Sequence, residues 1–406
     1  MNTVEIPPSF TVQSLTITVI VLFYACGSPE SEKQINDPFE GVTEIVPQTI
    51  AEITGESDSG GTADFVFGSD FFEEITFDSS GELLLNNRGN MKILYFDAEG
   101  EYLGSFAGRG QGPGEFMSWP YLDVYQNDML TALDRYTLRA NIFERQDGSW
   151  SLLNDFSLEP KEHYELSDVF VLGSDRIAVI YSPDSRFMVE GKPGKVRLKK
   201  KIDLFSTSGE LIEENWMEIP STEYSAFSAP GGGGVAFPVL FGSHLLLDTG
   251  PEQTLYLAYT DQFAIDIYDL EANVTDSIRH SNYQTELTEA QREEAVEEQA
   301  GAVRMETDEV QQDLEDQLFE HSEQQTPPIK EMHVDRDTGH IIVKRHTFDE
   351  SPNWLLLDEN GQRIGGFRLD VNFSVHDFRH GRIAGALHEE ETYPTVLIKS
   401  LPENQK

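Results

Sequence analysis

Short apolar strands recur in pairs along this chain of 406 residues. The first pair is GELLLNN at 81–87 with KILYFDAEGEYLGSF at 92–106, and five similar pairs begin at 128, 175, 253, 339 and 381. Within each pair the residues alternate between apolar and polar or run apolar over strand length, which is typical of half-buried and fully buried strands. Six such units predict a repetitive all-β architecture.

Turn signals and a further strand before each pair complete these units. DAEG, STSG and DENG place Asp and Gly where a hairpin needs them. Because each unit then has room for four strands, the fold class that we predict is all-β, a six-bladed β-propeller. Residues 43–53 would supply the outer strand that the last unit lacks, and a pair of β-sandwiches is the alternative. The predicted innermost strands are EEITF (73–77), YLDVY (121–125), DVFVL (168–172), SHLLL (243–247), KEMHV (330–334) and SVHDF (374–378).

A helical insertion is predicted at 281–328, between blades four and five. Thr288 and Gln291 have the spacing of a capping box, and Pro327-Pro328 would end the segment. Apolar residues keep the spacing of one helix face, with a break near Thr307: Val296, Val303, Val310, Leu314 and Leu318. The insertion is either a lid or partner-docking hairpin beside the channel, or a solvated decoration with one apolar stripe packed on the propeller.

The charge balance is strongly acidic, with 29 Lys and Arg against 72 Asp and Glu and a net charge of −43. Such a surface repels nucleic acid and anionic membranes, so we exclude nucleic acid as a partner. An acidic coat suited to saline surroundings explains the composition better than a broad cation-binding role does.

The N-terminus has the pattern of a lipoprotein signal. LTITVIVLFYA at 15–25 is too short to span a bilayer as a helix and ends at Cys26, which is the sole cysteine of the chain. Tyr24-Ala25-Cys26-Gly27 resembles a bacterial lipobox, in which the cysteine is acylated. Phe23 and an n-region without Lys or Arg depart from that pattern, and a buried or disordered segment is the alternative. We expect a signal peptide at 1–26, a tether at 27–42, the propeller at 43–401 and a tail at 402–406.

GRGQGPGEF at 108–116 is rich in glycine but does not have the pattern of a phosphate-binding loop. No Lys follows the glycines, and Pro113 stands where a dinucleotide fingerprint needs Gly. We therefore interpret the segment as a connector between the first and second blades. Its glycines would allow positive φ and close backbone approach.

These features together resemble the six-bladed, NHL/TolB-like β-propeller lipoproteins of Bacteroidetes-type bacteria. The most specific parts are GRGQGPGEF, the turn formed by Phe96, Asp97 and Gly100, and the lipobox. The resemblance covers about residues 43–400. It implies a protein anchored by lipid in the outer or cell membrane, periplasmic or surface-exposed, and it implies no particular activity.

The loops joining an outer strand to the next innermost strand share one face of a propeller. We expect GRGQGPGEF, the glycine run at 229–238 and the insertion to lie on that face, with the basic loop at 191–201 also there. Cationic groups in an acidic protein favour an anionic ligand, although such arginines can instead pair with Asp134 or Glu115. The candidate ligand-binding residues are Arg88, Arg109, Gln111, Glu115, Arg135, Arg345 and His346.

Motifs for catalysis are weak, so we name no catalytic residue. There is no Gly-x-Ser-x-Gly elbow, and His376 and His380 would lie roughly 13 Å apart on a strand. We expect a non-enzymatic, monomeric propeller without a cofactor that binds a small anionic ligand or a partner protein. The alternative is a calcium-dependent hydrolase or lyase of the lactonase kind, with candidate ligands Glu74, Asp123, His244, His333 and His376.

Overall fold

The computed structural model describes residues 37–54, 74–87, 91–125, 129–184, 194–229, 233–301, 308–348, 351–388 and 394–402. All of them belong to one compact unit, Asn36–Lys406. The predicted signal peptide, its lipobox and Arg88 lie outside the described residues.

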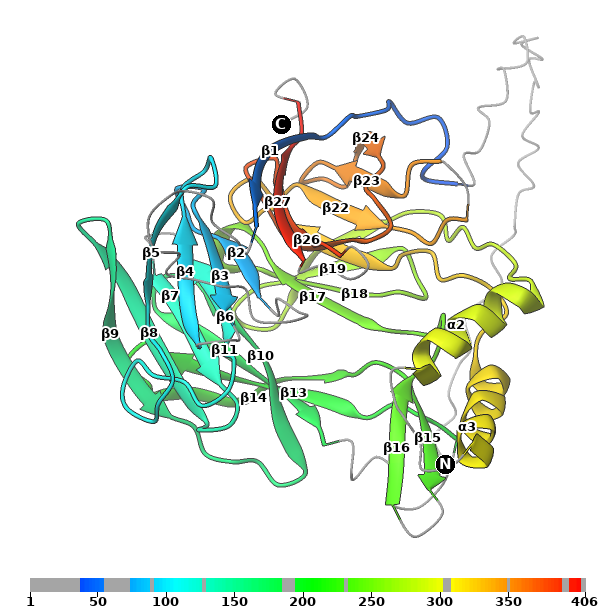
Figure 1. Ribbon diagram of the computed structural model, residues 1–406, viewed down its shortest axis with the longest axis horizontal. Coiled ribbons are helices and arrows are strands. Elements are labelled where there is room, and N and C mark those ends of the chain that lie inside the picture. The colour runs from blue at the N-terminus through cyan, green and yellow to red at the C-terminus, as the bar shows by residue number, and fades with distance from the viewer. Residues whose placement is uncertain are drawn as a thin grey trace, which may run out of the picture. The chain divides into compact units, whose positions relative to one another are not determined.

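The described chain is mostly β and contains six four-stranded antiparallel sheets (Figure 1). The first holds β2 (Ile75–Phe77), β3 (Leu83–Asn87), β4 (Lys92–Phe96) and β5 (Tyr102–Phe106). The second holds β6 (Tyr121–Tyr125), β7 (Met129–Asp134), β8 (Arg139–Gln146) and β9 (Ser149–Ser157). The third holds β10 (Tyr164–Leu172), β11 (Arg176–Pro183), β13 (Lys199–Ser206) and β14 (Leu211–Pro220).

The other three sheets have the same construction. The fourth holds β17 (Leu245–Thr249), β18 (Leu255–Tyr259), β19 (Ala264–Tyr268) and β20 (Val274–Arg279), with a 3₁₀ turn, η1 (Pro251–Gln253), between the first two strands. The fifth holds β21 (Glu331–Val334), β22 (Ile341–Lys344), β23 (Trp354–Leu357) and β24 (Arg363–Phe367). The sixth holds β25 (Phe373–Arg379), β26 (Arg382–Leu387), β27 (Thr395–Ser400) and β1 (Gln48–Ile53).

The first strand of each sheet contacts its counterpart in the next sheet. Contacts join β2 to β6, β6 to β10, β10 to β17, β17 to β21 and β21 to β25, and β25 returns to β2. A separate cluster of buried apolar side chains fills each junction between consecutive sheets. Radially repeated four-stranded sheets that pack face to face are the construction of a β-propeller.

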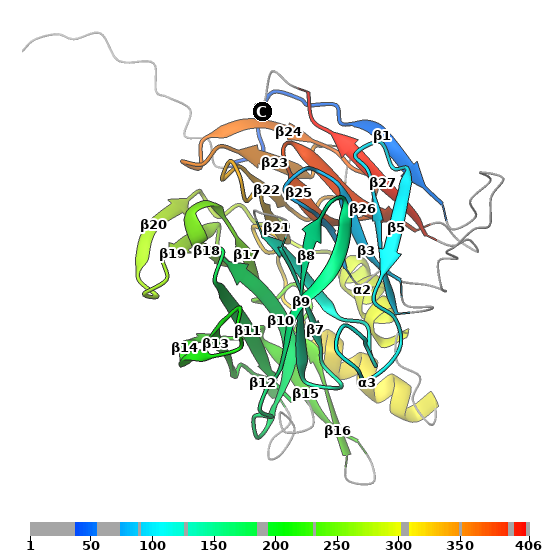
Figure 2. The same cartoon turned by 90° about the vertical axis from the view of Figure 1, so that its left-hand side faces the viewer.

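The N-terminal strand β1 completes the last sheet, as the sequence predicts. It pairs antiparallel with β27, with Ile53 opposite Val396 (Figure 2). Ala51 and Ile53 are buried against strands of both the first and the last sheet. Gly100, at φ +86°, lies so close that a β-carbon there would meet that of Ala51 at 2.9 Å. The chain therefore joins its two ends through both backbone pairing and side-chain packing.

GRGQGPGEF connects β5 to β6 as a closed loop. Phe116 donates its backbone N–H to the carbonyl of Gly108 at 2.9 Å, and Glu115 Oε2 accepts from the backbone N–H of Gly112 at 2.8 Å. Gly114, at φ +74°, donates to Asn141 Oδ1 at 2.9 Å, and the Phe116 ring is fully buried. The glycines thus make room for the loop's own glutamate and for contact with the second sheet.

Two segments predicted as loops form strands instead. Ala229 ends β15 (Tyr224–Ala229), and most of the glycine run lies in β16 (Gly233–Pro238), which pairs with it. The basic loop at 191–201 contributes β12 (Gly194–Val196) and the start of β13. β12, β15 and β16 form a three-stranded sheet outside the six others. Pairing with a partner strand overrides the local preference of glycine and lysine for loops.

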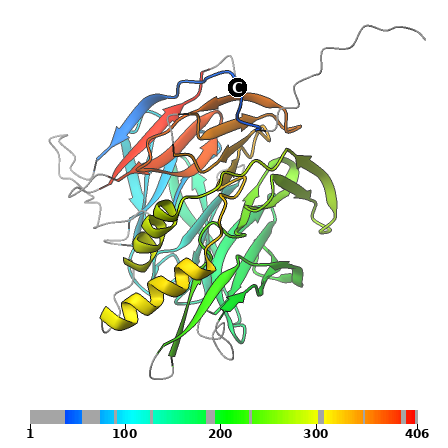
Figure 3. The ribbon, with the colours of Figure 1, turned by 90° about the vertical axis from the view of Figure 1, so that its right-hand side faces the viewer.

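Two helices, α2 (Glu289–Gly301) and α3 (Asp308–His321), lie between β20 and β21 and contact each other (Figure 3). Thr288 and Gln291 form the predicted capping box, since Thr288 N–H donates to Gln291 Oε1 at 2.9 Å and Gln291 N–H to Thr288 Oγ1 at 3.3 Å. The buried stripe Val296, Leu314 and Leu318 packs with Phe227 of β15. No described helix is long and apolar enough to cross a bilayer.

The end of the predicted tether, residues 37–42, packs on the fifth sheet rather than hanging free. Phe39 is buried, and the guanidinium of Arg345 stacks on its ring with 4.4 Å between Cζ and the ring centroid. Asp37 pairs with Arg345 at 2.8 Å, and Arg363 donates to the carbonyl of Pro38 at 3.1 Å. One aromatic anchor and two arginines hold this polar segment.

Replacing Ile53 tests the closure of the ring. We expect Ile53→Ala to lower the free energy of unfolding by about 2–4 kcal/mol, because it opens a cavity in the seam between the first and last sheets. Glu52→Ala, at an exposed position of the same strand, is the control and should change it by less than about 0.5 kcal/mol. Urea denaturation measures both values. If Ile53→Ala and Glu52→Ala change the free energy of unfolding equally and only slightly, β1 does not hold the first and last sheets together.

Candidate functional site

A small cavity of about 180 Å³ lies where the innermost strands of all six sheets meet. Apolar walls are contributed by residues such as Ile75, Leu122 and Leu247. The polar side chains that line it are Glu74, Thr76, Asp123, Asp168, Asp248, His333, Arg336, His376 and Asp377. We call this the channel cavity. It brings together carboxylates from five sheets with two histidines and one arginine.

Three of these carboxylates connect neighbouring sheets. Asp123 of the second sheet accepts a hydrogen bond from the backbone N–H of Val171 in the third, at 2.5 Å. Asp248 of the fourth accepts from Val334 in the fifth at 2.8 Å, and Asp377 of the sixth accepts from Phe77 in the first at 2.7 Å. The same contact therefore recurs at every second junction of the ring. Each carboxylate binds a backbone donor of the next innermost strand, away from bulk water.

Arg336 lies among these three aspartates. Its guanidinium forms an ion pair with Asp123, lies 3.9 Å from Asp248 and donates to the carbonyl of Val124 at 2.8 Å. The charges of Asp123, Asp248 and Asp377 raise the pKa of Arg336, although burial acts in the opposite direction. The arginine therefore stays protonated, and it follows directly after the strand β21 and Asp335 in the chain.

One guanidinium cannot neutralise every carboxylate in this cavity. Burial raises the pKa of Asp248 to about 7, against the opposing effects of Arg336 and the Val334 N–H. Burial likewise raises the pKa of Asp168 to about 6, with Lys200 and the Val169 N–H opposing it. The cavity therefore takes up protons near neutral pH, because charging all of its carboxylates together is costly in a poorly hydrated space.

A cluster of basic side chains lies at the start of the innermost strands of the fourth and fifth sheets. We call Lys330, Lys344, His244 and His346 the mouth cluster. Burial and the charges of Lys330, Lys344 and His244 lower the pKa of His346 to about 3, and its ring contacts Phe241 at 5.3 Å between centroids. Burial and the charge of Lys344 also lower the pKa of Lys330.

Only part of the mouth cluster is neutralised. Lys344 pairs with Glu331 at 2.8 Å and lies over the ring of Trp354 at 5.3 Å. His244 donates a hydrogen bond from Nε2 to the carbonyl oxygen of Val239 at 2.8 Å. Lys330 forms no ion pair within the described residues. The local field is thus positive in a protein that is strongly negative as a whole.

Two histidines of the channel cavity lie close to charged groups, and one of them, His333, is within electrostatic reach of Lys344 in the mouth cluster. His333 and His376 both line the cavity. Burial and the neighbouring His333 and His388 lower the pKa of His376 to about 4, and burial lowers the pKa of His333. Both imidazoles are neutral at pH 7, so each can donate one hydrogen bond and accept another.

The structure separates the ligand-binding residues that the sequence suggests. Arg109, Gln111 and Glu115 are exposed on the connector and do not line the channel cavity. Arg135 lies over the Trp119 ring at 5.4 Å and hydrogen-bonds Tyr121, the first residue of β6. Arg345 holds the segment 37–42 through Asp37 and Phe39. Among the described candidates, only His346 is a member of the mouth cluster.

The carboxylates suggested as partners of those arginines have other roles. Asp134 accepts hydrogen bonds from the backbone N–H of Met117 at 2.6 Å and of Tyr136 at 2.8 Å. Glu115 accepts from its own loop. Both therefore hold the chain where one sheet passes into the next.

The residues suggested for a calcium site are largely brought together. Glu74, Asp123, His333 and His376 line the channel cavity, whereas His244 lies in the mouth cluster. Within the described part of the chain, no three His, Cys, Asp or Glu side chains converge closely enough to hold a metal ion. The guanidinium of Arg336 supplies the positive charge among the central carboxylates. His380 lies apart from His376 and pairs with Asp337 at 2.5 Å.

Sequence reasoning overlooked Lys330, Lys344, Arg336 and Asp248. A signal for the aspartates does exist, because Asp123, Asp168, Asp248 and Asp377 each interrupt an apolar innermost strand. A carboxylate in such a position needs a partner or a proton. The lysines carry no comparable signal, since each stands at a strand end.

No family model matches this chain, and no curated protein matches it by sequence. Among solved structures it is similar to a protein of Bacteroides fragilis that is described as an exported protein. The TM-score is 0.45, with 10% identity over 88% of this chain and 95% of that one. It is also similar to a member of the DUF4221 family from Bacteroides vulgatus, with a TM-score of 0.48 and 9% identity over 89% and 98%. The WD40 repeats of RRP9 give a TM-score of 0.42 and 11% identity over 88% and 95%. These likenesses carry no information about activity, ligand or partner.

The raised pKa of Asp248 predicts an unusual dependence of stability on pH. The folded chain holds this proton more tightly than the unfolded chain, where the ordinary pKa is 3.8. The stabilisation is therefore complete below pH 3.8 and is lost as the pH rises through about 7. The lowered pKa values of His346 and His376 make stability rise with pH, but only below about pH 6.5.

We expect the free energy of unfolding to fall between about pH 6.5 and about pH 8, and Asp248→Asn to remove roughly 1 kcal/mol of that fall. Urea denaturation across this range measures it. Asp276→Asn, at an exposed position on β20, is the control and should keep the wild-type dependence. An unchanged dependence in Asp248→Asn would contradict the assignment.

Proposed function

We propose that the chain is a six-bladed β-propeller in which α2 and α3 form an insertion between the fourth and fifth blades. The cyclic contacts of the innermost strands support the number of blades. The position of both helices between β20 and β21 supports the insertion. The helices also contact β15, so they cover a neighbouring element as well as each other.

We further propose that the protein binds a small anionic ligand, a carboxylate or a phosphate, at the mouth of its channel. The observation that carries this proposal is the gathering of Lys330, Lys344, His244 and His346 at the mouth in a chain of net charge −43, where burial and the charges of the other three lower the pKa of His346 to about 3. Cations held close together at a desolvated site repel one another, and a bound anion relieves that repulsion.

The side chains have complementary roles in this proposal. Lys330, which forms no ion pair among the described residues although Glu331 and Glu298 lie within electrostatic reach, supplies the charge for the anion. Lys344 is held in place by Glu331 and by the Trp354 ring, so it contributes a second, fixed cation. His346 is neutral before binding and takes up a proton once an anion lies beside it. Glu298 of α2 affects the pKa of Lys330, so the insertion lies within electrostatic reach of the site.

In this proposal the anion is bound and released unchanged, with no reaction at the channel carboxylates. Asp168 and Asp248 have pKa values near neutrality, but Asp248 accepts a backbone hydrogen bond and Asp168 accepts one from Val169 at 2.8 Å. Their contacts are those of structural groups. We propose that the protein works as an exported monomer, anchored to the membrane by lipid on Cys26, which would keep the binding face in the extracytoplasmic space.

Anion binding is tested by isothermal titration calorimetry with inorganic phosphate and with galacturonate. We expect Lys330→Gln to weaken binding at least roughly ten-fold, because a charge-assisted hydrogen bond contributes about 1.5–3 kcal/mol. Lys399→Gln, on the outer seam where Lys399 donates to Thr49 Oγ1, should bind as the wild type does.

Proton uptake on anion binding is a second quantity that the same calorimetric titrations measure. Titrations in buffers of different ionisation enthalpy should show protons taken up on binding near pH 6, and His346→Gln should lose that uptake. Absence of binding to either anion, or equal loss of affinity in both lysine variants, would refute an anion site at the mouth cluster.

Lipid anchoring is tested by Cys26→Ser in the full chain. The variant should lose metabolic labelling with palmitate and move from the membrane fraction to the soluble fraction, because the sole acyl acceptor of the lipobox is gone. Membrane association that persists without Cys26 would show that another segment anchors the protein.

A further inference from the structure

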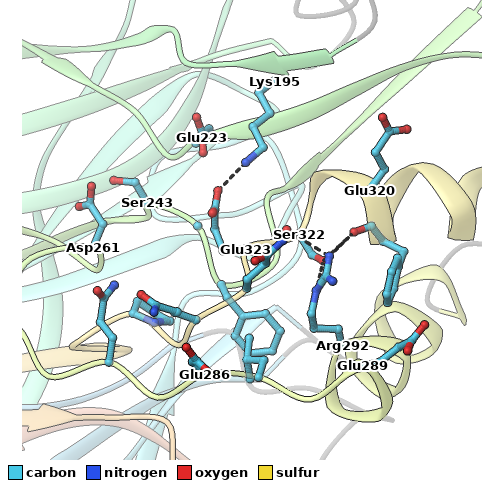
Figure 4. A pocket seen from close by; sticks show the side chains of 18 of the residues that line it. Lys195, Glu223, Ser243, Asp261, Glu286, Glu289, Arg292, Glu320, Ser322 and Glu323 are labelled. Atoms are coloured by element: carbon cyan, nitrogen blue, oxygen red, sulfur yellow. Dashed lines mark hydrogen bonds and ion pairs between the residues drawn. The ribbon is translucent and has the colours of Figure 1, made fainter.

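A second cavity, of about 1020 Å³, lies between the two helices, the sheet of β12, β15 and β16, and the entry to β17 (Figure 4). It shares no lining residue with the channel cavity. Its size lies at the upper end of the range of roughly 300–1,000 Å³ that is usual for small-molecule sites.

The cations on its wall already have partners. Lys195 pairs with Glu323 at 2.5 Å, as Figure 4 shows. Arg292 donates to Ser322 Oγ at 2.7 Å and to the carbonyl of Phe319 at 2.6 Å. Arg197 of the same wall donates to a backbone carbonyl at 2.8 Å and stacks on an aromatic ring. Only Lys195 is paired with a carboxylate, but six acidic side chains line the cavity against three basic ones, so the wall is negative as a whole.

Three carboxylates of the wall have no cation bound to them in the described part of the chain. Glu223, Asp261 and Glu286 line the cavity, and none of them forms an ion pair within the described residues. They come from separate elements: Glu223 precedes β15, Asp261 lies in the turn between β18 and β19, and Glu286 precedes α2. The negative charge is therefore spread along the wall rather than gathered at one point.

A buried hydroxyl provides an independent indication of a ligand. Ser243 lines the cavity and is only 7% exposed, and its hydroxyl has no hydrogen-bond partner among the described residues. Its carbonyl accepts from the N–H of Glu223 at 2.8 Å, which fixes the two residues side by side. Figure 4 shows Ser243 on the wall with Glu223 and Asp261. A buried polar atom without a partner is costly, and a donor from a ligand would satisfy it.

We propose that this cavity binds a linear organic polycation, a molecule with two or more ammonium or guanidinium groups spaced along a flexible chain. Separated carboxylates match separated charges. Within the described residues no three His, Cys, Asp or Glu side chains converge on a point, as a metal ion would require. The ring of Phe241 on the wall offers apolar contact to the methylene groups between the charges. A free polyamine and a lysine-rich peptide share this chemistry.

The test is calorimetry on the full chain at physiological salt, with spermidine and with tetralysine as probes and Mg²⁺ as the comparison. Physiological salt is needed because it screens the non-specific attraction of any cation to a chain of net charge −43. We expect the double variant Asp261→Asn/Glu286→Gln to weaken binding of the better probe at least roughly ten-fold. We expect Ser243→Ala to weaken it about three-fold or more, without lowering Tm.

The matched control is Glu213→Gln/Asp276→Asn, which removes the same charge from exposed positions of β14 and β20. It should bind both probes as the wild type does. Tighter binding of spermidine identifies a free polyamine, and tighter binding of tetralysine identifies a peptide. The proposal is overturned if both probes bind no more tightly than Mg²⁺, or if the control variant loses as much affinity. Phosphate binding at the mouth cluster should not change in any of these variants, so the two sites are tested separately.

Discussion

The ring depends on carboxylates that bind the backbone of the neighbouring sheet. Asp123, Asp248 and Asp377 do so at alternate junctions, and the guanidinium of Arg336 lies among them. A buried charge is tolerated only with a partner, and removing one partner from such a set is far more costly than the net gain from forming it. The network therefore adds little stability by comparison with apolar packing between sheets. Its effect is directional, because hydrogen bonds to a single backbone N–H fix how far one innermost strand slides along the next.

This arrangement also determines where charge is available to ligands. Arg336 is occupied by carboxylates, so it cannot serve an anion that enters the channel. The cations that remain are those at the mouth, chiefly Lys330. The ring of Phe241 touches His346, and the same residue lines the larger cavity, where carboxylates outnumber cations by six to three. Two regions of opposite sign thus adjoin within a strongly acidic protein. Each is defined by which charged side chains the fold brings together, rather than by their order along the chain.

Local sequence pattern was sufficient to predict the repeated strands, the turn at Asp97 and the capping box at Thr288, because each depends on neighbours in the chain. It was insufficient for β16. A run of glycines favours loops, yet here it pairs with β15, and Phe227 of β15 packs on helices that follow about 70–90 residues later in the chain. The site shows the same limit. An aspartate in an apolar strand announces a buried partner, but Arg336 and Val171 become partners only through the ring. No pattern near Lys330 indicates that it will face His346.

The helices and the extra sheet form a structural unit with its own small core. Phe227, Val296, Leu314 and Leu318 pack together, apart from the six clusters between the sheets. Because this core is separate, the wall that carries Ser243 and Glu286 is held by two independent bodies, the helical unit and the fourth sheet. The strand-like pairing of Glu286 with Gln325 and the hydrogen bonds between Thr285 and Thr326 connect the two ends of the insertion. The insertion therefore adds a wall to the propeller, and its acidic side chains line a cavity that the propeller alone would not possess.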